Sequence, residues 1–91
     1  MKKLSAIIAC YKDEQAIPIM AQRLEAVFTK IGVDYEIIFV NDGSPDNSQS
    51  VIEKLCAGNP RIKGILHSRN FSSQMAFTSG RKVATGDGVI L

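Results

Sequence analysis

The feature that most constrains the fold is a short apolar run, Ile37–Val40, which ends in a polar turn, Asn41–Asp46. Four consecutive apolar residues followed by turn-forming residues are typical of a strand buried on both faces of a parallel sheet. Open sheets of this kind bind ligands at the carboxyl ends of their strands. The acidic residues of the turn therefore lie where a ligand site is expected, and Asp42 is the first candidate.

Further apolar runs alternate with amphipathic segments along the chain. We expect strands at residues 4–9, 35–40, 62–66 and from about 88, and helices at 16–31, from about 48 to 58, and from 72 or 73 to about 84. Apolar residues spaced three and four apart mark the helical segments. Pro18 suits the first turn of the first helix, and Gly32 suits its left-handed end.

This order, β-α-β-α-β-α-β with short connections, predicts a Rossmann-like α/β fold. Right-handed crossovers give a parallel sheet with strand order 3-2-1-4 and helices on both faces. The loops after strands one, two and four then meet at the switch point of the sheet. We expect Gly80 to let the third helix approach the sheet closely. Residues 86–91 begin the fourth strand, so we expect the chain to be a truncated part of a larger domain.

Charge and cysteine content argue against several classes of function. The net charge is +2 and the basic residues are scattered, whereas a nucleic-acid surface shows a basic stripe. Cys10 and Cys56 share no metal-ligand spacing and suit reduced thiols in a cytoplasmic protein. No segment approaches the roughly 20 apolar residues of a membrane span, and the short apolar run after Met1 does not fit a signal peptide.

The loop after the first strand argues against a bare pyrophosphate site. Residues 10–15 contain no glycine, so both the Gly-x-Gly-x-x-Gly fingerprint and a Walker A loop are absent there. An aromatic ring and carboxylates at the switch point suit a base and a ribose instead. Tyr11 is placed to stack on a base, and Asp42 to accept a hydrogen bond from a ring N–H.

Four blocks of the sequence, in order, resemble one enzyme family. Ser5–Glu14 resembles an opening strand with a Pro-x-Tyr-Asn-Glu loop, and Phe39–Asp46 an Asp-Asp-Gly-Ser-x-Asp turn. Ser68–Ala76 resembles an Arg-Asn-Phe-Gly-x-x-x-Ala segment, and Gly80 with Ala84–Asp87 matches the spacing that follows. These blocks are similar to those of the inverting family-2 glycosyltransferases, which have the A-type nucleotide-diphospho-sugar transferase fold and include polyprenyl-phosphate and dolichol-phosphate sugar transferases.

The resemblance implies roles for individual residues. Asp42 would bind the uracil or guanine ring of a nucleotide-sugar donor. Tyr11 and the backbone of Ala9 would pack on the base, and Glu14 would contact the nucleoside. Gln74, at the start of the third helix, would reach the base edge.

The chain also departs from the family pattern. Ala9 replaces a proline, Lys12 an asparagine, Asn41 the first aspartate of the pair, and Ser72 a glycine. The family's Asp-x-Asp ligands for Mg²⁺ or Mn²⁺, its catalytic base and its acceptor site come later than Leu91. We therefore expect residues 1–91 to be the amino-terminal nucleotide-binding part of a catalytic domain, with no catalytic or metal-binding residue of its own.

For the complete protein the resemblance implies a bacterial hexosyltransferase of cell-wall or glycan biosynthesis. It would transfer a hexose from a UDP- or GDP-sugar, with inversion, to a polyprenyl phosphate or another glycan acceptor. It would act at the cytoplasmic face of the membrane. We expect the 91 residues alone to be inactive, and we expect them to self-associate because residues 89–91 form an apolar edge strand.

Two other functions stay open from the sequence. One is a non-catalytic nucleotide-binding or regulatory α/β domain, including a receiver-like module, although the acid-ended strand here is the second and not the first. The other is a truncated product that only folds or oligomerises, which a donor titration would separate from the first. At the residue level, Tyr11 also suits loop packing, Asp42 and Asp46 suit turn and cap roles, and His67 suits a hydrogen-bonded loop histidine.

Overall fold

The computed structural model describes residues 3–12, 14–67 and 73–90. Strands and helices alternate along them in the predicted order. The elements are β1 (Lys3–Cys10), α1 (Ala16–Ile31), β2 (Asp34–Asp42), α2 (Ser48–Gly58), β3 (Ile62–His67), α3 (Ser73–Val83) and β4 (Gly88–Ile90). The sequence-based boundaries are confirmed to within about two residues, and β2 extends beyond its apolar run at both ends.

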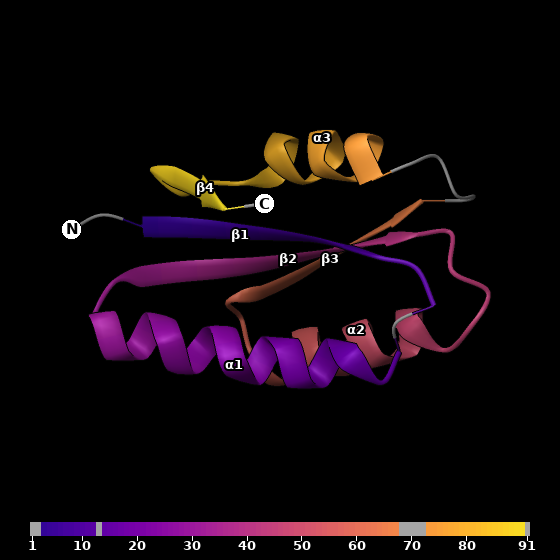
Figure 1. The fold of residues 1–91 in the computed structure, drawn as a ribbon, viewed down its shortest axis with the longest axis horizontal. Helices are drawn as coiled ribbons and strands as arrows, with labels where there is room; N and C mark the ends of the chain where they lie inside the picture. The colour runs from indigo at the N-terminus through magenta and orange to yellow at the C-terminus, as the bar shows by residue number, and fades with distance from the viewer. Residues whose placement is uncertain (1–2, 13, 68–72, 91) are drawn as a thin grey trace.

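All four strands belong to one parallel sheet with the order β3-β2-β1-β4. Helices α1 and α2 cover one face of this sheet and α3 lies on the other (Figure 1). The predicted strand order is therefore confirmed. Strand β1 pairs with β2 along its whole length, from Lys3 opposite Asp34 to Cys10 opposite Asn41. The loops that follow these two strands consequently leave the sheet side by side.

Strand β2 forms the centre of the core, as its apolar run predicts. Its side chains alternate between the two faces of the sheet. Ile37 and Phe39 belong to the cluster that includes Phe28 of α1 and Ile52 of α2. Ile38 and Val40 belong to a smaller cluster on the opposite face, around Ile7. Each of the four residues Ile37–Val40 has no exposed side-chain surface.

Two glycines have the roles that the sequence indicates. Gly32 ends α1 with φ 73°, and its N–H donates to the carbonyl oxygen of Phe28 at 3.0 Å. Gly80 faces β1 so closely that a Cβ atom there would collide with the side chain of Ile7. Helix α3 therefore packs against the sheet at the distance that a residue without a side chain permits.

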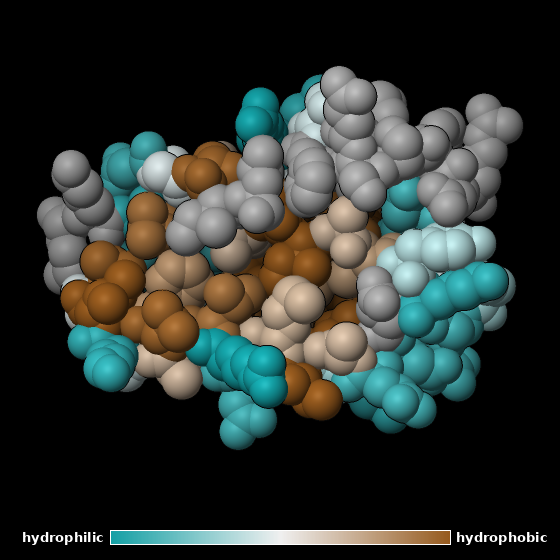
Figure 2. Space-filling model, in the orientation of Figure 1, coloured by the Kyte–Doolittle hydropathy of each residue, from teal (hydrophilic) through white to brown (hydrophobic). Residues whose placement is uncertain are grey.

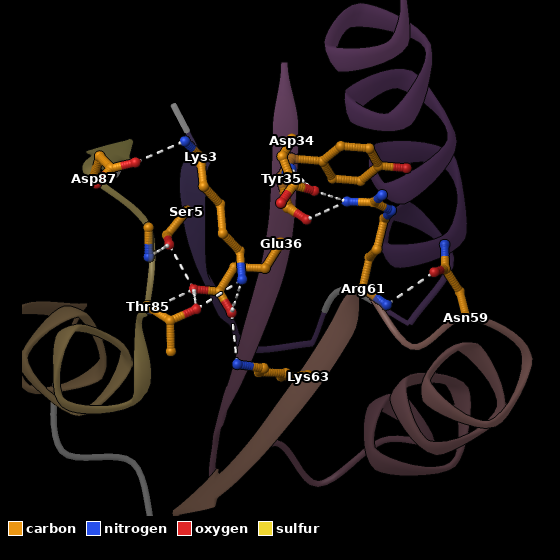
Figure 3. A network of polar contacts seen from close by, with 11 residues as sticks. Lys3, Ser5, Asp34, Tyr35, Glu36, Asn59, Arg61, Lys63, Thr85 and Asp87 are labelled. Atoms are coloured by element: carbon orange, nitrogen blue, oxygen red, sulfur yellow. Dashed lines mark hydrogen bonds and ion pairs between the residues drawn. The ribbon is translucent and has the colours of Figure 1, made fainter. Parts of the chain in front are cut away.

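A buried carboxylate joins the amino-terminal ends of the strands (Figure 3). Glu36 of β2 is 1% exposed and accepts hydrogen bonds from Ser5 Oγ at 2.5 Å and from the Thr85 N–H at 2.6 Å. Its Oε1 lies 2.6 Å from Lys63 Nζ of β3. Burial raises the pKa of Glu36, but hydrogen bonds from Lys63, Ser5 and Thr85 outweigh it and lower this pKa to about 2. We call Glu36, Ser5, Lys63 and Thr85 the glutamate clamp.

One face of the molecule remains apolar. Figure 2 shows hydrophobic side chains gathered across the face toward the viewer, above α1. Several large apolar residues of α1 are exposed, including Val27 at 54% and Ile31 at 57%. Val89 of β4 is 42% exposed. An exposed apolar face on a small α/β unit is typical of a surface that another part of a protein covers.

Candidate functional site

The loops after β1 and β2 are bonded to each other at the carboxyl ends of these strands, which we call the ligand edge. The Lys12 N–H donates to Ser44 Oγ at 2.9 Å, and the Glu14 N–H donates to Asp46 Oδ2 at 3.4 Å. Lys12 has φ 57°, a left-handed conformation that non-glycine residues seldom adopt. The two loops therefore form one structure, in which a shift of either loop moves the other.

Asp46 is the acceptor on which this loop structure depends. Its Oδ1 accepts from Ser44 Oγ at 2.5 Å and from the Ser48 N–H at 3.0 Å, at the first residue of α2. These hydrogen bonds, with that from Ser44 the largest influence, lower the pKa of Asp46 to about 2. The turn role expected for Asp46 is therefore confirmed, whereas the N-cap position of α2 belongs to Asn47, which forms no side-chain cap hydrogen bond. The Ser48 N–H, in the first turn of α2, thus donates to the carboxylate of Asp46. The side-chain Oγ of Ser48 has no hydrogen-bond partner among the described residues.

Asn41 holds the turn that follows β2 and is 1% exposed. Its Oδ1 accepts from the Ser44 N–H at 2.9 Å, and its Nδ2 donates to Gln49 Oε1 at 3.1 Å. The oxygen of the amide is thus the acceptor of one bond, and its nitrogen is the donor of the other. A carboxylate at this position would lack the donor, so the asparagine suits this turn. Gly43 takes φ 72° within the same turn.

Asp42, the last residue of β2, is paired with a histidine from the neighbouring strand. It is 4% exposed, and its Oδ1 lies 3.0 Å from Nδ1 of His67, the last residue of β3. Nε2 of His67 lies 2.8 Å from Ser79 Oγ in α3. The side chains of Asp42 and His67 are 6% and 11% exposed. Three elements therefore meet in a chain of polar contacts at the ligand edge.

The other predicted site residues lie at the same edge in different environments. Tyr11 is 40% exposed, and Lys12 Nζ lies 5.6 Å from the centre of its ring. Ala9 is half-buried and packs against the smaller core cluster. Gln74 lies in the first turn of α3, but its side chain is outside the described residues.

A hollow of about 290 Å³ opens at this edge. Its lining residues are Lys12, Glu14, Gln15, Ala16 and Asp46. Of the predicted site residues, Glu14 lines it, whereas Tyr11 and Asp42 do not. The structure thus brings the candidates to one edge of the sheet, but Glu14 is the only one of them that lines the hollow. A hollow between a carboxylate and an ammonium group suits a polar group better than an apolar one.

The described residues form neither a metal-binding cluster nor a membrane-spanning helix. Residues 3–12, 14–67 and 73–90 contain no cluster of three His, Cys, Asp or Glu side chains that would hold a metal ion. No helix formed by the same residues is long and apolar enough to cross a bilayer. Cys10 and Cys56 are free thiols, as expected.

Comparison with known proteins assigns the family. The model of the family described as "Glycosyl transferase family 2" matches residues 5–91. The chain belongs to glycosyl transferase family 2. The match begins in β1 and includes both loops of the ligand edge, so the family's sequence pattern and the loop structure coincide.

Curated relatives of this family-2 chain are much longer than it is. An uncharacterized glycosyltransferase, YkcC, of Bacillus subtilis (strain 168) is 37% identical over 87 residues, which are 96% of this chain and 27% of the relative. A prophage bactoprenol glucosyl transferase homolog of Escherichia coli (strain K12) is 33% identical over 88 residues, or 97% of this chain and 29% of the relative. The chain spans little more than a quarter of the length of these relatives.

A solved structure has the same fold. The mannosyltransferase PcManGT from Pyrobaculum calidifontis, in complex with GDP-Man and Mn²⁺, matches with a TM-score of 0.72 and 17% sequence identity. The match covers 97% of this chain and 26% of that one. At this identity the likeness establishes the fold, and it confirms the predicted nucleotide-sugar transferase type of sheet.

The sequence alone does not predict the pairing of Asp42 with His67, because it indicates only a hydrogen-bonded loop histidine. That histidine is hydrogen-bonded as expected, but its partners are the candidate base-binding residue and α3. The signal is in the register, because Asp42 and His67 are directly paired in the ladder between β2 and β3. Aligning the apolar runs 37–40 and 62–66 with an offset of 25 residues would have placed them together.

Proposed function

We propose that the complete protein is an inverting hexosyltransferase, and that residues 1–91 form its amino-terminal nucleotide-binding part. The observation that carries the proposal is the family-2 match over residues 5–91, which includes the whole ligand edge. The relative named as a bactoprenol glucosyl transferase homolog supports a polyprenyl phosphate acceptor, with another glycan as the alternative. A phosphate acceptor is anionic near neutral pH and needs little deprotonation before it attacks the anomeric carbon. A single in-line displacement then gives inversion.

Within this proposal the ligand edge receives the nucleoside of the donor. Asp42 accepts a hydrogen bond from a ring N–H, which uracil carries at N3 and guanine at N1. Tyr11 stacks on the base because its ring is exposed beside the loop backbone, and the backbone at Ala9 packs against the same base. Glu14 contacts the ribose from the hollow. Gln74, from the first turn of α3, reaches the base edge.

We propose that other parts of the polypeptide hold the diphosphate and the sugar of the donor. The solved mannosyltransferase binds GDP-Man and Mn²⁺, and we propose a divalent cation, Mg²⁺ or Mn²⁺, for the complete protein as well. Such an ion would neutralise the departing diphosphate. Its ligands would belong to other parts of the polypeptide, because residues 3–12, 14–67 and 73–90 offer no cluster for them. We further propose that transfer occurs at the cytoplasmic face of a membrane.

The proposal is tested by nucleotide binding to the complete protein. Isothermal titration should give measurable affinity for UDP or GDP and weaker affinity for CDP and ADP, which lack the ring N–H. A hydrogen bond to a buried carboxylate contributes about 1.5–3 kcal/mol, so Asp42→Ala should weaken the preferred nucleotide about tenfold or more. Asp34→Ala, at the opposite end of the same strand, is the matched control and should leave the affinity unchanged.

A transfer assay, added to the titration, separates the competing functions. It uses labelled nucleotide sugars, polyprenyl phosphate and Mg²⁺ or Mn²⁺. Nucleotide binding without transfer of labelled sugar would favour a non-catalytic nucleotide-binding domain. Equal affinity for all four nucleotides, unchanged in Asp42→Ala, would remove Asp42 from the site.

A further inference from the structure

The contacts from Asp42 through His67 to Ser79 join three elements at the ligand edge. His67 ends β3, Ser79 lies in the second half of α3, and Asp42 ends β2. The distances, 3.0 Å from His67 Nδ1 to Asp42 Oδ1 and 2.8 Å from His67 Nε2 to Ser79 Oγ, are those of two hydrogen bonds. Both ends of the imidazole are therefore engaged.

The partners assign the tautomer of His67. A carboxylate only accepts hydrogen bonds, so the proton in the contact with Asp42 belongs to Nδ1 of the imidazole. In the neutral ring Nε2 is then the acceptor, and the Ser79 hydroxyl donates to it. Ser79 in this way fixes the ring, and the ring fixes one oxygen of the Asp42 carboxylate. Because a carboxylate is planar, holding one oxygen also sets the direction of the other.

The same order of groups occurs in serine hydrolases, but the surroundings here do not suit a nucleophile. Ser79 lies within α3, and in the interior of a helix the backbone N–H groups bond to carbonyls one turn earlier. Ala84 at the helix end follows this pattern, with its N–H bonded to the Gly80 carbonyl at 3.0 Å. The helix thus presents no backbone donors for an oxyanion beside Ser79 Oγ. Positioning of Asp42 is the role that the geometry supports.

We propose that His67 is a positioning residue for nucleotide recognition, which Ser79 holds in place from α3, and that it determines the preference of the site for bases with a ring N–H. This inference rests on the proposed function, in which Asp42 receives the base. Burial of both side chains makes the arrangement effective, since neighbouring groups and not water then hold the carboxylate. A carboxylate aimed by His67 accepts from uracil N3 or guanine N1. It opposes cytosine N3 or adenine N1, which are acceptors.

The test measures base preference in the complete protein and not affinity alone. The readout is the ratio of dissociation constants for CDP and UDP, or for ADP and GDP if the site prefers purines. In His67→Gln the side-chain amide nitrogen reaches the position of Nε2 and not Nδ1, so we expect the ratio to fall at least fivefold. In His67→Asn the amide nitrogen takes the position of Nδ1, and we expect this variant to rescue the ratio to within about twofold of the wild-type value.

Two serine variants separate positioning from general damage. Ser79→Ala removes the hydroxyl that holds the ring, and we expect the ratio to fall two- to threefold. Ser50→Ala makes the same chemical change on α2, where the side chain is exposed, and should leave the ratio unchanged. Melting temperatures of all variants are measured in parallel, so a loss of folded protein is recognised. If His67→Gln does not fold, His67→Asn and Ser79→Ala still give the ratio.

A spectroscopic measurement tests the tautomer directly. In protein labelled with ¹⁵N-histidine, the His67 signals are those that disappear in His67→Asn. We expect a protonated Nδ1 and an unprotonated, hydrogen-bonded Nε2, and a change in both signals when UDP or GDP is added. The opposite tautomer would overturn the proposal.

The outcomes also distinguish this inference from the proposed function. If Asp42→Ala leaves nucleotide binding unchanged, the role of Asp42 is wrong and the positioning role falls with it. If Asp42→Ala abolishes the base preference while His67→Gln and Ser79→Ala retain it, His67 is a structural residue and this inference alone is overturned. Equal weakening of all nucleotides by the His67 variants, with no change in the ratio, has the same meaning.

Discussion

Tyr11 is 40% exposed at the ligand edge, with Lys12 Nζ 5.6 Å from the centre of its ring. Stacking of a base on an aromatic ring contributes about 1–3 kcal/mol. We therefore predict that Tyr11→Ala weakens UDP or GDP binding about tenfold, because the stacking surface is lost. Tyr11→Phe should bind within about twofold of the wild type, since the ring remains. Isothermal titration of the complete protein measures both. An equal loss in Tyr11→Phe would assign the effect to the hydroxyl and not to stacking.

Asp46 has a pKa of about 2, below its ordinary value of 3.8. A group whose pKa is lowered by folding stabilises the folded state above the unfolded pKa, and this contribution disappears as pH falls through the folded pKa. We predict that Asp46→Asn melts at a lower temperature than the wild type at pH 6, because the amide has one acceptor oxygen where the carboxylate has two, and the hydrogen bonds from Ser44, Ser48 and Glu14 cannot all be kept. The difference should narrow between about pH 4 and pH 2. Thermal melts across this range test it, and a constant difference would contradict it.

The residue scale is also where sequence and structure diverge most. The turn that Asp46 forms is local, so the turn pattern predicts it, whereas Gly80 packs against Ile7 of a strand that is distant in sequence. The partners of Asp42 are not local, because His67 is 25 residues away and Ser79 a further 12. Those contacts depend on strand register and on the depth to which α3 packs. Strand register and the packing depth of α3 cannot be predicted from the composition of one segment, because each depends on how two segments fit together.

The strands and helices themselves were predictable because each has one dominant signal. The apolar run of β2 and the three-and-four spacing of α1 identify these elements without tertiary information. The extension of β2 to Asp34–Asp42 was missed because its flanking residues are polar. Asn41 is buried within the strand because its amide is hydrogen-bonded to Gln49 of α2 and to the Ser44 N–H. Polar residues of this kind are assigned to loops when a strand is considered alone.

The glutamate clamp links β1, β2 and β3 to the connection between α3 and β4. Its removal should therefore weaken the packing of all these elements. We predict that Glu36→Gln destabilises the fold by about 1–3 kcal/mol. The estimate lies below the usual cost of breaking a buried pair, about 3–5 kcal/mol, because Lys63 is 40% exposed. Urea unfolding of the 91-residue chain measures it. Glu53→Gln, on the surface of α2, is the control and should change the unfolding free energy by less than about 0.5 kcal/mol.

The whole molecule exposes an apolar face over α1 and a three-residue edge strand, β4. We predict that the 91-residue chain by itself self-associates and transfers no sugar. Sedimentation should show dimers or larger species, and a double variant, Val27→Glu with Ile31→Glu, should shift them toward monomer. Gln22→Glu, an exposed change on the same helix, is the control. A monomeric wild type would contradict the first part, and sugar transfer above background would contradict the second.

The opposite ends of β2 have different chemistry, with Glu36 in the clamp and Asp42 at the ligand edge, and an apolar segment separates them. In protein engineering this separation has a practical value. A library randomised at positions 11, 14 and 67 varies the contacts proposed for the nucleotide but leaves the clamp intact. Directed evolution toward a different sugar nucleotide can therefore explore these positions while the cell continues to accumulate folded protein.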